Sequence, residues 1–260
     1  MAKFPIDWSK ARILVSNDDG IYAPGLKVLE RIARSLTKDV WTVAPEQEQS
    51  GAGHSLTLRQ PLRMRRVSAR RFAVDGTPTD CVLLAINHLL KDHRPTLVLS
   101  GVNRGANMGE DVTYSGTIAA AMEATLLGVP AVALSLGVAW NKHPHWATAE
   151  HFAPKLIRKL AKAGWPDGVL ININFPNLPV AEVRGVTLAR QGRRKLGDSL
   201  VQSTDPRGRL YWWIGDARTE DEALRGTDLW VLRQGRIAMT PIDLNLTDEP
   251  TLKRLQPLFK

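Results

Sequence analysis

Short apolar runs alternate with helical patterns over residues 1–135. Apolar runs of strand length occupy residues 12–16, 40–43, 96–100 and 129–136. Over residues 24–36, apolar positions recur every three or four residues, which is the spacing of one face of a helix. Residues 117–127 are predicted to form a second helix, which ends at Gly128. Strands that alternate with helices predict an α/β fold with a parallel sheet wound with helices.

A β-excursion and a further helix complete this half of the chain. Residues 56–67 and 71–74 have a composition typical of strands. Thr77 precedes Pro78, and Asp80 stands at the third helical position. These residues predict a helix that is capped by Thr77 and ends near Leu90.

The pattern after residue 136 is less regular. We expect a helix over 147–163, kinked or divided by Pro154, and then a strand over 169–174. Strand-like runs separated by turn residues follow at 183–188, 210–214, 228–233 and 236–240. We therefore predict a single domain over residues 1–260. Its core spans 1–136, and 137–260 completes the sheet and carries β-hairpin arms for subunit contacts.

Composition excludes several classes of protein. Hydrophobic residues make up 43% of the 260 residues, enough for a large core. No run of eighteen apolar residues exists, and the N-terminal stretch has no apolar segment of signal-peptide length. Cys81 is the only cysteine, which excludes an intrachain disulfide and a cysteine metal cluster. We expect a cytoplasmic protein with no membrane partner.

The net charge of +9 is concentrated in two stretches. The first contains Arg59, Arg63, Arg65, Arg66, Arg70 and Arg71, and the second contains Arg184, Arg190, Arg193, Arg194, Lys195, Arg207 and Arg209. Both stretches are interpreted either as solvated faces of hairpins or as a positive field that attracts a phosphorylated substrate.

Polar loops follow three of the predicted strands. They cover residues 17–20 (NDDG), 44–51 (APEQEQSG) and 101–107 (GVNRGAN), and the last continues to 115–117 (SGT). Because ligands of open parallel sheets bind outside the carboxyl ends of the strands, these loops are expected to converge at one edge of the sheet.

Asp18 and Asp19 directly follow the first strand. Two adjacent carboxylates repel each other unless a cation or a shared proton separates them. The alternative is that Asp18 caps a turn and Asp19 faces solvent. Together with Ser50 and Asn103, the pair offers oxygen ligands suited to Mg²⁺, Mn²⁺ or Ca²⁺. Zinc is disfavoured because His54, just after the second loop, is the only nearby histidine, and the loops contain no cysteine.

The residues Ser115, Gly116 and Thr117 lead into a predicted helix, and a helix N-terminus suits a phosphate group. The alternative is an ordinary N-cap. The preceding connection, 101–114, is long and rich in Gly and Asn, which favours a functional loop. The P-loop, dinucleotide-binding and serine-hydrolase motifs are all absent from the sequence.

At these positions the chain resembles the SurE family of survival proteins, the 5'/3'-nucleotidases. The matching motifs are 16–20 (SNDDG) with 23–25 (APG), 44–45 (AP) with 49–51 (QSG), 76–78 (GTP) with Asp80, 100–107 (SGVNRGAN), 114–117 (YSGT), 172–176 (NINFP), 205–209 (DPRGR) and 240–241 (TP). The resemblance covers almost the whole chain, and the order and spacing of the motifs are specific.

The resemblance implies a Rossmann-like core and one divalent cation per subunit, Mg²⁺ or Mn²⁺. The implied metal ligands are Asp18, Asp19, Ser50 and Asn103, and the implied phosphate ligands are Asn107, Ser115, Gly116 and Thr117. It also implies a homodimer or homotetramer with an exchanged C-terminal element and, in some members, activity on short polyphosphate.

We therefore expect a metal-dependent phosphomonoesterase that acts on nucleoside 5'- and also 3'-monophosphates, with no nucleic-acid partner. Asp18, Asp19 and Asn107 are the expected catalytic residues. Asp19 is expected to accept a proton from the attacking water, while Asn107 and the 115–117 segment hold the phosphoryl oxygens. The alternatives are a covalent aspartyl-phosphate at Asp18 or Asp19, a basic nucleic-acid or polyphosphate binder, and a structural oligomer.

The segment 190–214 is basic, rich in turn residues and ends in Tyr211, Trp212, Trp213 and Ile214. Three consecutive aromatic residues cannot share one face of a strand. The segment is interpreted either as a hairpin packed on its own subunit or as an arm that crosses to a partner and borders the partner's active site.

Overall fold

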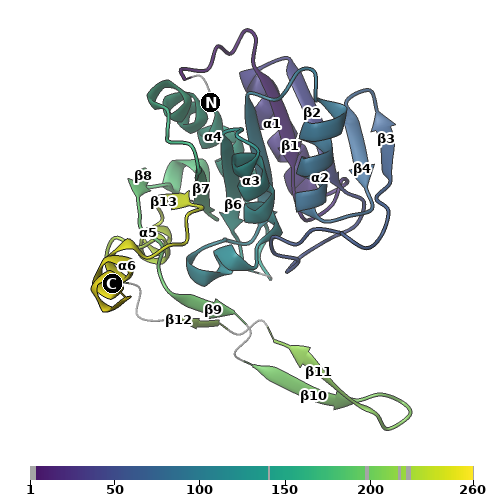
Figure 1. Ribbon diagram of the computed structural model, residues 1–260, viewed down its shortest axis with the longest axis vertical. Coiled ribbons are helices and arrows are strands. Elements are labelled where there is room, and N and C mark those ends of the chain that lie inside the picture. The colour runs from purple at the N-terminus through teal and green to yellow at the C-terminus, as the bar shows by residue number, and fades with distance from the viewer. Residues whose placement is uncertain (1–3, 140, 197–198, 216–217, 221–223, 260) are drawn as a thin grey trace.

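A nine-stranded sheet forms the centre of the computed structural model, which describes residues 4–139, 141–196, 199–215, 218–220 and 224–259 (Figure 1). The strand order is β3-β4-β2-β1-β5-β6-β7-β13-β8. The strands are β1 (Arg12–Ser16), β2 (Asp39–Pro45), β3 (Met64–Ser68), β4 (Arg71–Val74), β5 (Leu97–Arg104), β6 (Ala131–Gly137), β7 (Val169–Pro176), β8 (Val186–Leu188) and β13 (Ile237–Asp243). Neighbours from β4 to β7 are parallel, which confirms the α/β prediction.

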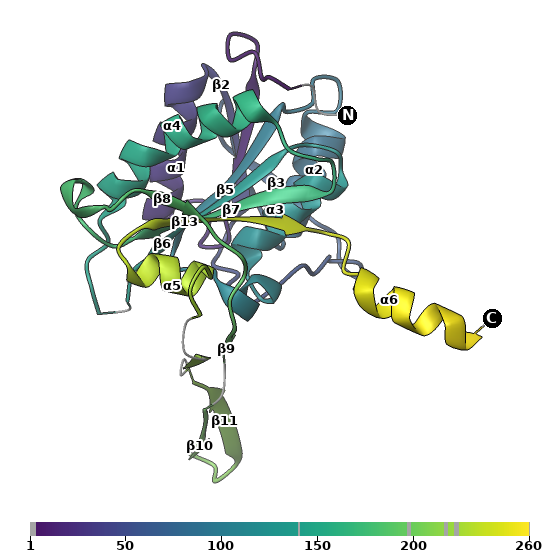
Figure 2. The same cartoon turned by 90° about the vertical axis from the view of Figure 1, so that its left-hand side faces the viewer.

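Helices cover both faces of this sheet (Figure 2). One face carries α1 (Pro24–Leu36) and α4 (Trp146–Ala163), and the other carries α2 (Pro78–Leu84) and α3 (Gly116–Leu126). The side chains of β1 alternate between the two resulting cores, because successive residues of a strand point to opposite faces. Ile13 and Val15 belong to the core under α1 and α4, and Leu14 belongs to the core under α2 and α3.

The strands after residue 137 extend the same sheet. β7 is parallel to β6, and β13 is antiparallel to β7. Two hairpins then leave the sheet as an arm (Figure 1). They pair β9 (Arg194–Leu196) with β12 (Arg218–Glu220), and β10 (Leu200–Thr204) with β11 (Leu210–Ile214). No helix within the described ranges is long and apolar enough to cross a membrane.

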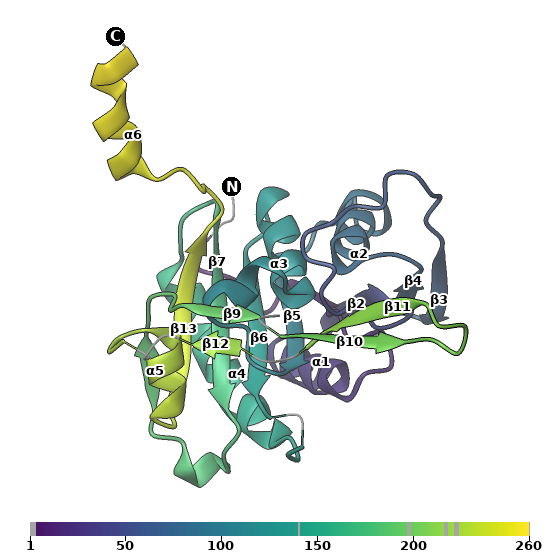
Figure 3. The same ribbon diagram turned by 90° about the horizontal axis from the view of Figure 1, so that it is seen from below.

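The C-terminal helix α6 (Glu249–Leu255) also projects from the body of the molecule, as Figure 3 shows from below. A short 3-10 turn, Gln256–Phe259, follows it. The arm and α6 are therefore the elements with the least support from the rest of the chain.

Side-chain N-caps mark the starts of two helices. The predicted capping box at α2 is confirmed, since Thr77 Oγ1 accepts from Asp80 N at 3.1 Å and Asp80 Oδ2 accepts from Thr77 N at 2.9 Å. The expectation of a strand over 228–233 is wrong, because α5 (Asp228–Arg233) occupies it. Thr227 caps α5, and a six-residue run is too short for its period to reveal a helix.

Three other boundaries differ from expectation. Only β3 forms within 56–67, where Pro61 cannot donate to a strand ladder. Only β8 forms within 183–188, after a 3-10 turn at Val180–Glu182. α4 is not divided at Pro154 but continues through it.

Candidate active site

The order of the strands reverses at β1, which pairs with β2 on one side and β5 on the other. The helices that follow β1 and β5, α1 and α3, lie on opposite faces of the sheet, which opens a crevice at the carboxyl ends of the two strands. A cavity of about 350 Å³ lies there, which we call the polar cavity. It is lined by Asp18, Asp19, Glu48, Ser50, Gly51, Asn103, Arg104, Gly105, Ala106, Asn107, Asp111, Tyr114 and Ser115. The three polar loops therefore meet at one edge.

Two carboxyl groups stand at the end of β1, Asp18 buried and Asp19 partly buried. Asp18 is 5% exposed, and its Oδ1 accepts a hydrogen bond from Thr117 Oγ1 at 2.5 Å. Burial raises the pKa of Asp18, against the opposing effect of the Thr117 hydrogen bond. Burial, followed by the negative charges of Asp18 and Glu48, raises the pKa of Asp19 to about 7. A positive charge bound here would offset both the cost of burying these carboxylates and the repulsion between them.

Neutral oxygen atoms complete a donor set that fits a divalent cation. Asn103 Nδ2 donates to the Gly105 carbonyl at 2.9 Å, which leaves its Oδ1 as the atom able to ligate a metal. The Ser50 hydroxyl donates to Glu48 at 2.8 Å. Among the described residues no group of three or more His, Cys, Asp or Glu side chains is placed to hold a metal. Two carboxylates with hydroxyl and amide oxygens suit Mg²⁺ or Mn²⁺ better than zinc.

The start of α3 lies against Asp18. Ser115 caps this helix, with its Oγ accepting from Ile118 N at 3.1 Å. A Cβ atom on Gly116 would lie 2.7 Å from the Asp18 Cβ, so the close approach requires glycine. Of the four predicted phosphate ligands, all within the described chain, Asn107 and Ser115 line the polar cavity, whereas the fully buried Thr117 directs its hydroxyl to Asp18.

Strand β7 holds the backbone of Asn107. Asn174 accepts from Asn107 N at 2.9 Å and donates to Asn107 O at 3.0 Å. Asn172 donates to the same carbonyl at 2.8 Å. The Asn107 side chain donates to Ser135 Oγ at 2.9 Å. Asn107 is therefore fixed at both its backbone and its side chain.

The root of the arm is bound to the loop that carries these residues. Arg194 and Asp111 form an ion pair in which each side chain is 6% exposed, and Arg194 Nη2 also donates to the Ala106 carbonyl at 3.1 Å. Asp228 accepts from Gly109 N at 3.0 Å and from Gly192 N at 2.8 Å. Contacts between residues more than eighty positions apart thus position this loop.

The polar cavity is also lined by Glu48, Arg104, Asp111 and Tyr114. None of these four has a separate role that the sequence predicts. The two residues that hold Asn107 can be recognised in the sequence, because Asn172 and Asn174 are polar residues on one face of an otherwise apolar strand. No feature of the sequence distinguishes Arg194, because it stands among other basic residues.

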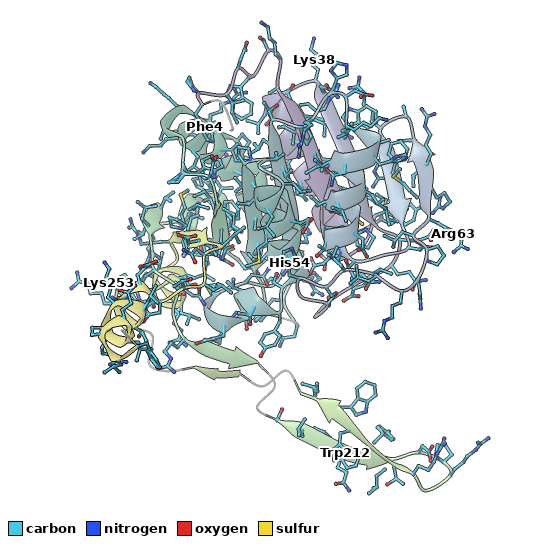
Figure 4. All side chains as sticks on the ribbon, in the orientation of Figure 1. Phe4, Lys38, His54, Arg63, Trp212 and Lys253 are labelled. Carbon is cyan, nitrogen blue, oxygen red and sulfur yellow. The ribbon has the colours of Figure 1, made fainter. Side chains whose placement is uncertain are left out.

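The first arginine stretch lies on β3, on β4 and in the segments next to them, and four of its six arginines pair with carboxylates. Its ion pairs are Arg63–Asp75 at 3.6 Å, Arg65–Glu46 at 2.6 Å, Arg70–Asp39 at 3.1 Å and Arg71–Glu30 at 2.7 Å. These pairs favour a structural role for this stretch over a field that attracts the substrate. His54, labelled in Figure 4, contacts Glu123 of α3 at 3.0 Å.

Comparisons with known proteins agree with this geometry. The family model described as "Survival protein SurE" matches residues 13–198. The chain is 59% identical over 256 residues to the 5'-nucleotidase SurE of Paramagnetospirillum magneticum, covering 97% of each chain. It is 54% identical to the 5'-nucleotidase SurE of Rhodospirillum rubrum, covering 97% of this chain and 98% of the relative. The crystal structure of SurE protein from Aquifex aeolicus superposes with a TM-score of 0.83 at 38% identity, covering 96% of this chain and all of that chain.

Proposed function

This chain belongs to the SurE family and is a 5'-nucleotidase, and we propose that it hydrolyses nucleoside monophosphates with the help of one divalent cation, Mg²⁺ or Mn²⁺. The proposed metal ligands are Asp18, Asp19, Ser50 and Asn103. One observation carries the proposal: two adjacent carboxyl groups, one buried and one partly buried, stand together at the wall of a polar cavity and both have raised pKa values. Such a pair is stable in its charged form when a cation binds it.

The bound cation supplies positive charge that lowers the pKa of a nearby water and neutralises charge on the phosphoryl group. Asp19, which lines the polar cavity, accepts a proton from the attacking water at its carboxylate. Thr117 holds the Asp18 carboxylate in place through its hydroxyl. Asn107, Ser115 and the Gly116 backbone at the start of α3 bind the phosphoryl oxygens and align the phosphorus for attack.

Action on 3'-monophosphates and on short polyphosphate belongs to the same proposal and rests on the resemblance alone. The polar cavity is compatible with these additional substrates, because its polar residues suit a phosphoryl group and none of them selects a particular sugar position. We further infer a cytoplasmic enzyme.

A homodimer or homotetramer is also proposed. An isolated two-stranded hairpin is marginally stable in water. Nevertheless, β10 and β11 expose Leu200 at 66%, Trp213 at 64% and Ile214 at 76%. Tyr211 and Trp213 contact each other edge to face with ring centroids 6.2 Å apart, and both are exposed. A partner subunit that covers these side chains explains why an apolar hairpin extends from the molecule.

The decisive test is release of inorganic phosphate from a panel of 5'- and 3'-nucleotides and tripolyphosphate, with each divalent cation and with chelator. We expect turnover of 5'-monophosphates that disappears with chelator and returns with Mg²⁺ or Mn²⁺. Equal turnover with chelator contradicts the metal proposal. Capture of a phosphorylated Asp18 or Asp19 peptide after acid quenching establishes the covalent route instead. Salt-sensitive binding of nucleic acid without turnover establishes the binding-protein alternative.

A further inference from the structure

A second cavity, of about 390 Å³, lies beside the polar cavity. It is lined by Asp19, Ala23, Pro24, Gly25, Arg104, Pro144 and Trp146, and we call it the Trp146 cavity. Asp19 and Arg104 line both cavities, which places the two side by side. We propose that the Trp146 cavity receives the nucleobase of the substrate, an inference that rests on the proposed nucleotidase function.

The two cavities differ in chemistry in the same way as the two ends of a nucleotide, the charged phosphate and the flat uncharged base. The polar cavity presents carboxyl, amide and hydroxyl groups, which suit a phosphoryl group and its counter-ion. The Trp146 cavity presents the apolar surfaces of Ala23, Pro24, Pro144 and Trp146. Stacking on an aromatic side chain accepts any base, because every base has a π-face. The arrangement therefore predicts a preference for nucleotides over phosphorylated sugars that lack a base, with weak selection among bases.

The wall that carries Pro144 and Trp146 is held in place before any ligand binds. The side chain of Asn177 accepts from His145 N at 2.7 Å and donates to the His143 carbonyl at 3.0 Å. Arg104 Nη2 donates to the Lys142 carbonyl at 3.4 Å, which ties the boundary residue to the same loop. A preformed wall reduces the conformational entropy that is lost when a ligand binds.

The position of Trp146 depends on Gly25. A Cβ atom at residue 25 would lie 2.0 Å from the Val102 carbonyl oxygen and 3.3 Å from Trp146 Cη2. The indole therefore rests its outer ring edge against the start of α1, next to the end of β5. This contact leaves Trp146 partly buried and still part of the cavity wall.

Tyr114 is the competing aromatic residue, since it lines the polar cavity and is 41% exposed. The polar cavity of about 350 Å³ must already hold the phosphoryl group, the attacking water and the proposed cation. The Trp146 cavity, of about 390 Å³, offers separate space beyond the shared residues Asp19 and Arg104. This separate space favours Trp146 as the residue on which the base stacks.

The test compares kcat/KM for adenosine 5'-monophosphate and for ribose 5-phosphate, which has the same phosphate and sugar but no base. We expect Trp146→Ala to lower the ratio of the two values by about 5- to 150-fold, mainly through KM for the nucleotide. Trp146→Phe, which keeps a flat ring, should retain the ratio within about threefold. Trp165→Ala is the matched control, because Trp165 contacts Phe4 with ring centroids 4.8 Å apart and lines a different cavity.

Ala23→Trp provides a second measurement that does not depend on the fold of the Trp146 variant. It fills the Trp146 cavity and should lower the same ratio. The inference is overturned if Trp146→Ala and Ala23→Trp lower both kcat/KM values equally or not at all, or if Tyr114→Ala alone removes the preference. Failure of the wild-type protein to release phosphate from either substrate with Mg²⁺ or Mn²⁺ overturns the proposed function itself, and is distinguishable from those outcomes.

Discussion

At the scale of single residues, the site depends on carboxyl groups whose charge is opposed by their surroundings. Asp18 and Asp19 both have raised pKa values, chiefly because they are buried. Buried acids of this kind destabilise the folded protein when they are ionised and gain most from a bound cation. At the proposed metal site, binding of a cation should therefore stabilise the folded protein through these two positions.

We predict that Asp18→Asn and Asp19→Asn each lower kcat/KM by at least about 100-fold while the fold is retained, because each removes charge at the site that polarises the reaction. Circular dichroism and a metal-binding titration check the fold and the loss of affinity. Near-normal turnover with unchanged metal dependence would remove that residue from the site.

The pKa of Asp19, about 7 in the folded protein against 3.8 for an ordinary aspartate, also predicts a pH dependence. The folded state holds this proton more tightly than the unfolded chain, so the stabilisation is complete below about pH 4 and is lost as the pH rises through about 7. With chelator present, Asp19→Asn should therefore gain up to about 4 kcal/mol over wild type between pH 4 and pH 8. Urea unfolding at several pH values measures this difference, and parallel profiles would contradict it.

Thr117→Val removes the hydroxyl that donates to Asp18. A hydrogen bond to a charged group contributes about 1.5–3 kcal/mol, so we expect kcat/KM to fall by about 10- to 100-fold. Thr117→Ser keeps the hydroxyl and is the matched control. If valine and serine variants show the same activity, the hydroxyl does not position Asp18.

At the scale of elements, β7 supports the catalytic loop from beneath. Asn174 makes two hydrogen bonds to the backbone of Asn107, and Asn172 makes one. The strand thus uses polar side chains at alternate positions to fix a loop that otherwise has little regular structure. A positioning error of about 1 Å in such a loop can lower the rate by about 100-fold.

Asn174→Ala should lower the free energy of unfolding by about 1–3 kcal/mol and reduce kcat by about 10- to 100-fold, because it leaves the buried backbone N–H of Asn107 without its partner. Asn172→Ala, which removes a single bond, should have the smaller effect on both. Urea unfolding and steady-state kinetics separate the two quantities. Normal kcat in a destabilised Asn174→Ala protein would show that β7 contributes stability alone.

At the scale of the whole molecule, the arm joins the site of its own subunit to an exposed apolar hairpin. Its root carries Arg194, which is paired with Asp111 beside the polar cavity. Its far part exposes apolar side chains on β10 and β11. The base of that far hairpin is closed by a hydrogen bond from Gly215 N to Ser199 O at 2.8 Å.

Replacement of residues 200–214 by an Asn-Gly turn removes the far hairpin and keeps Arg194. We expect a smaller assembly by light scattering and reduced kcat/KM, because the arm is proposed to reach a partner and border its active site. Arg194→Met is the matched comparison, since it should lower activity by leaving the buried Asp111 without its ion pair, with no change in assembly. A hairpin deletion that keeps the original mass and full activity would contradict the proposed arm.

The features that depend on neighbouring residues could be predicted from the amino-acid sequence. The apolar periods located the parallel strands and the main helices, and Thr77, Pro78 and Asp80 marked the start of α2. The polar loops after β1, β2 and β5 pointed to one edge of the sheet, because the carboxyl ends of parallel strands lie together. These signals are local, or follow from a general rule of sheet geometry.

The contacts between distant residues could be identified in the folded structure and not in the sequence. The hydroxyl of Thr117 turned out to bind Asp18, ninety-nine positions away, where the sequence assigned it to phosphate. Arg194 and Asp111, Asn174 and Asn107, and Trp146 and Gly25 are likewise brought together by the packing of whole elements. No local propensity encodes such pairs, since each depends on the register of strands and the placement of helices across the entire sheet.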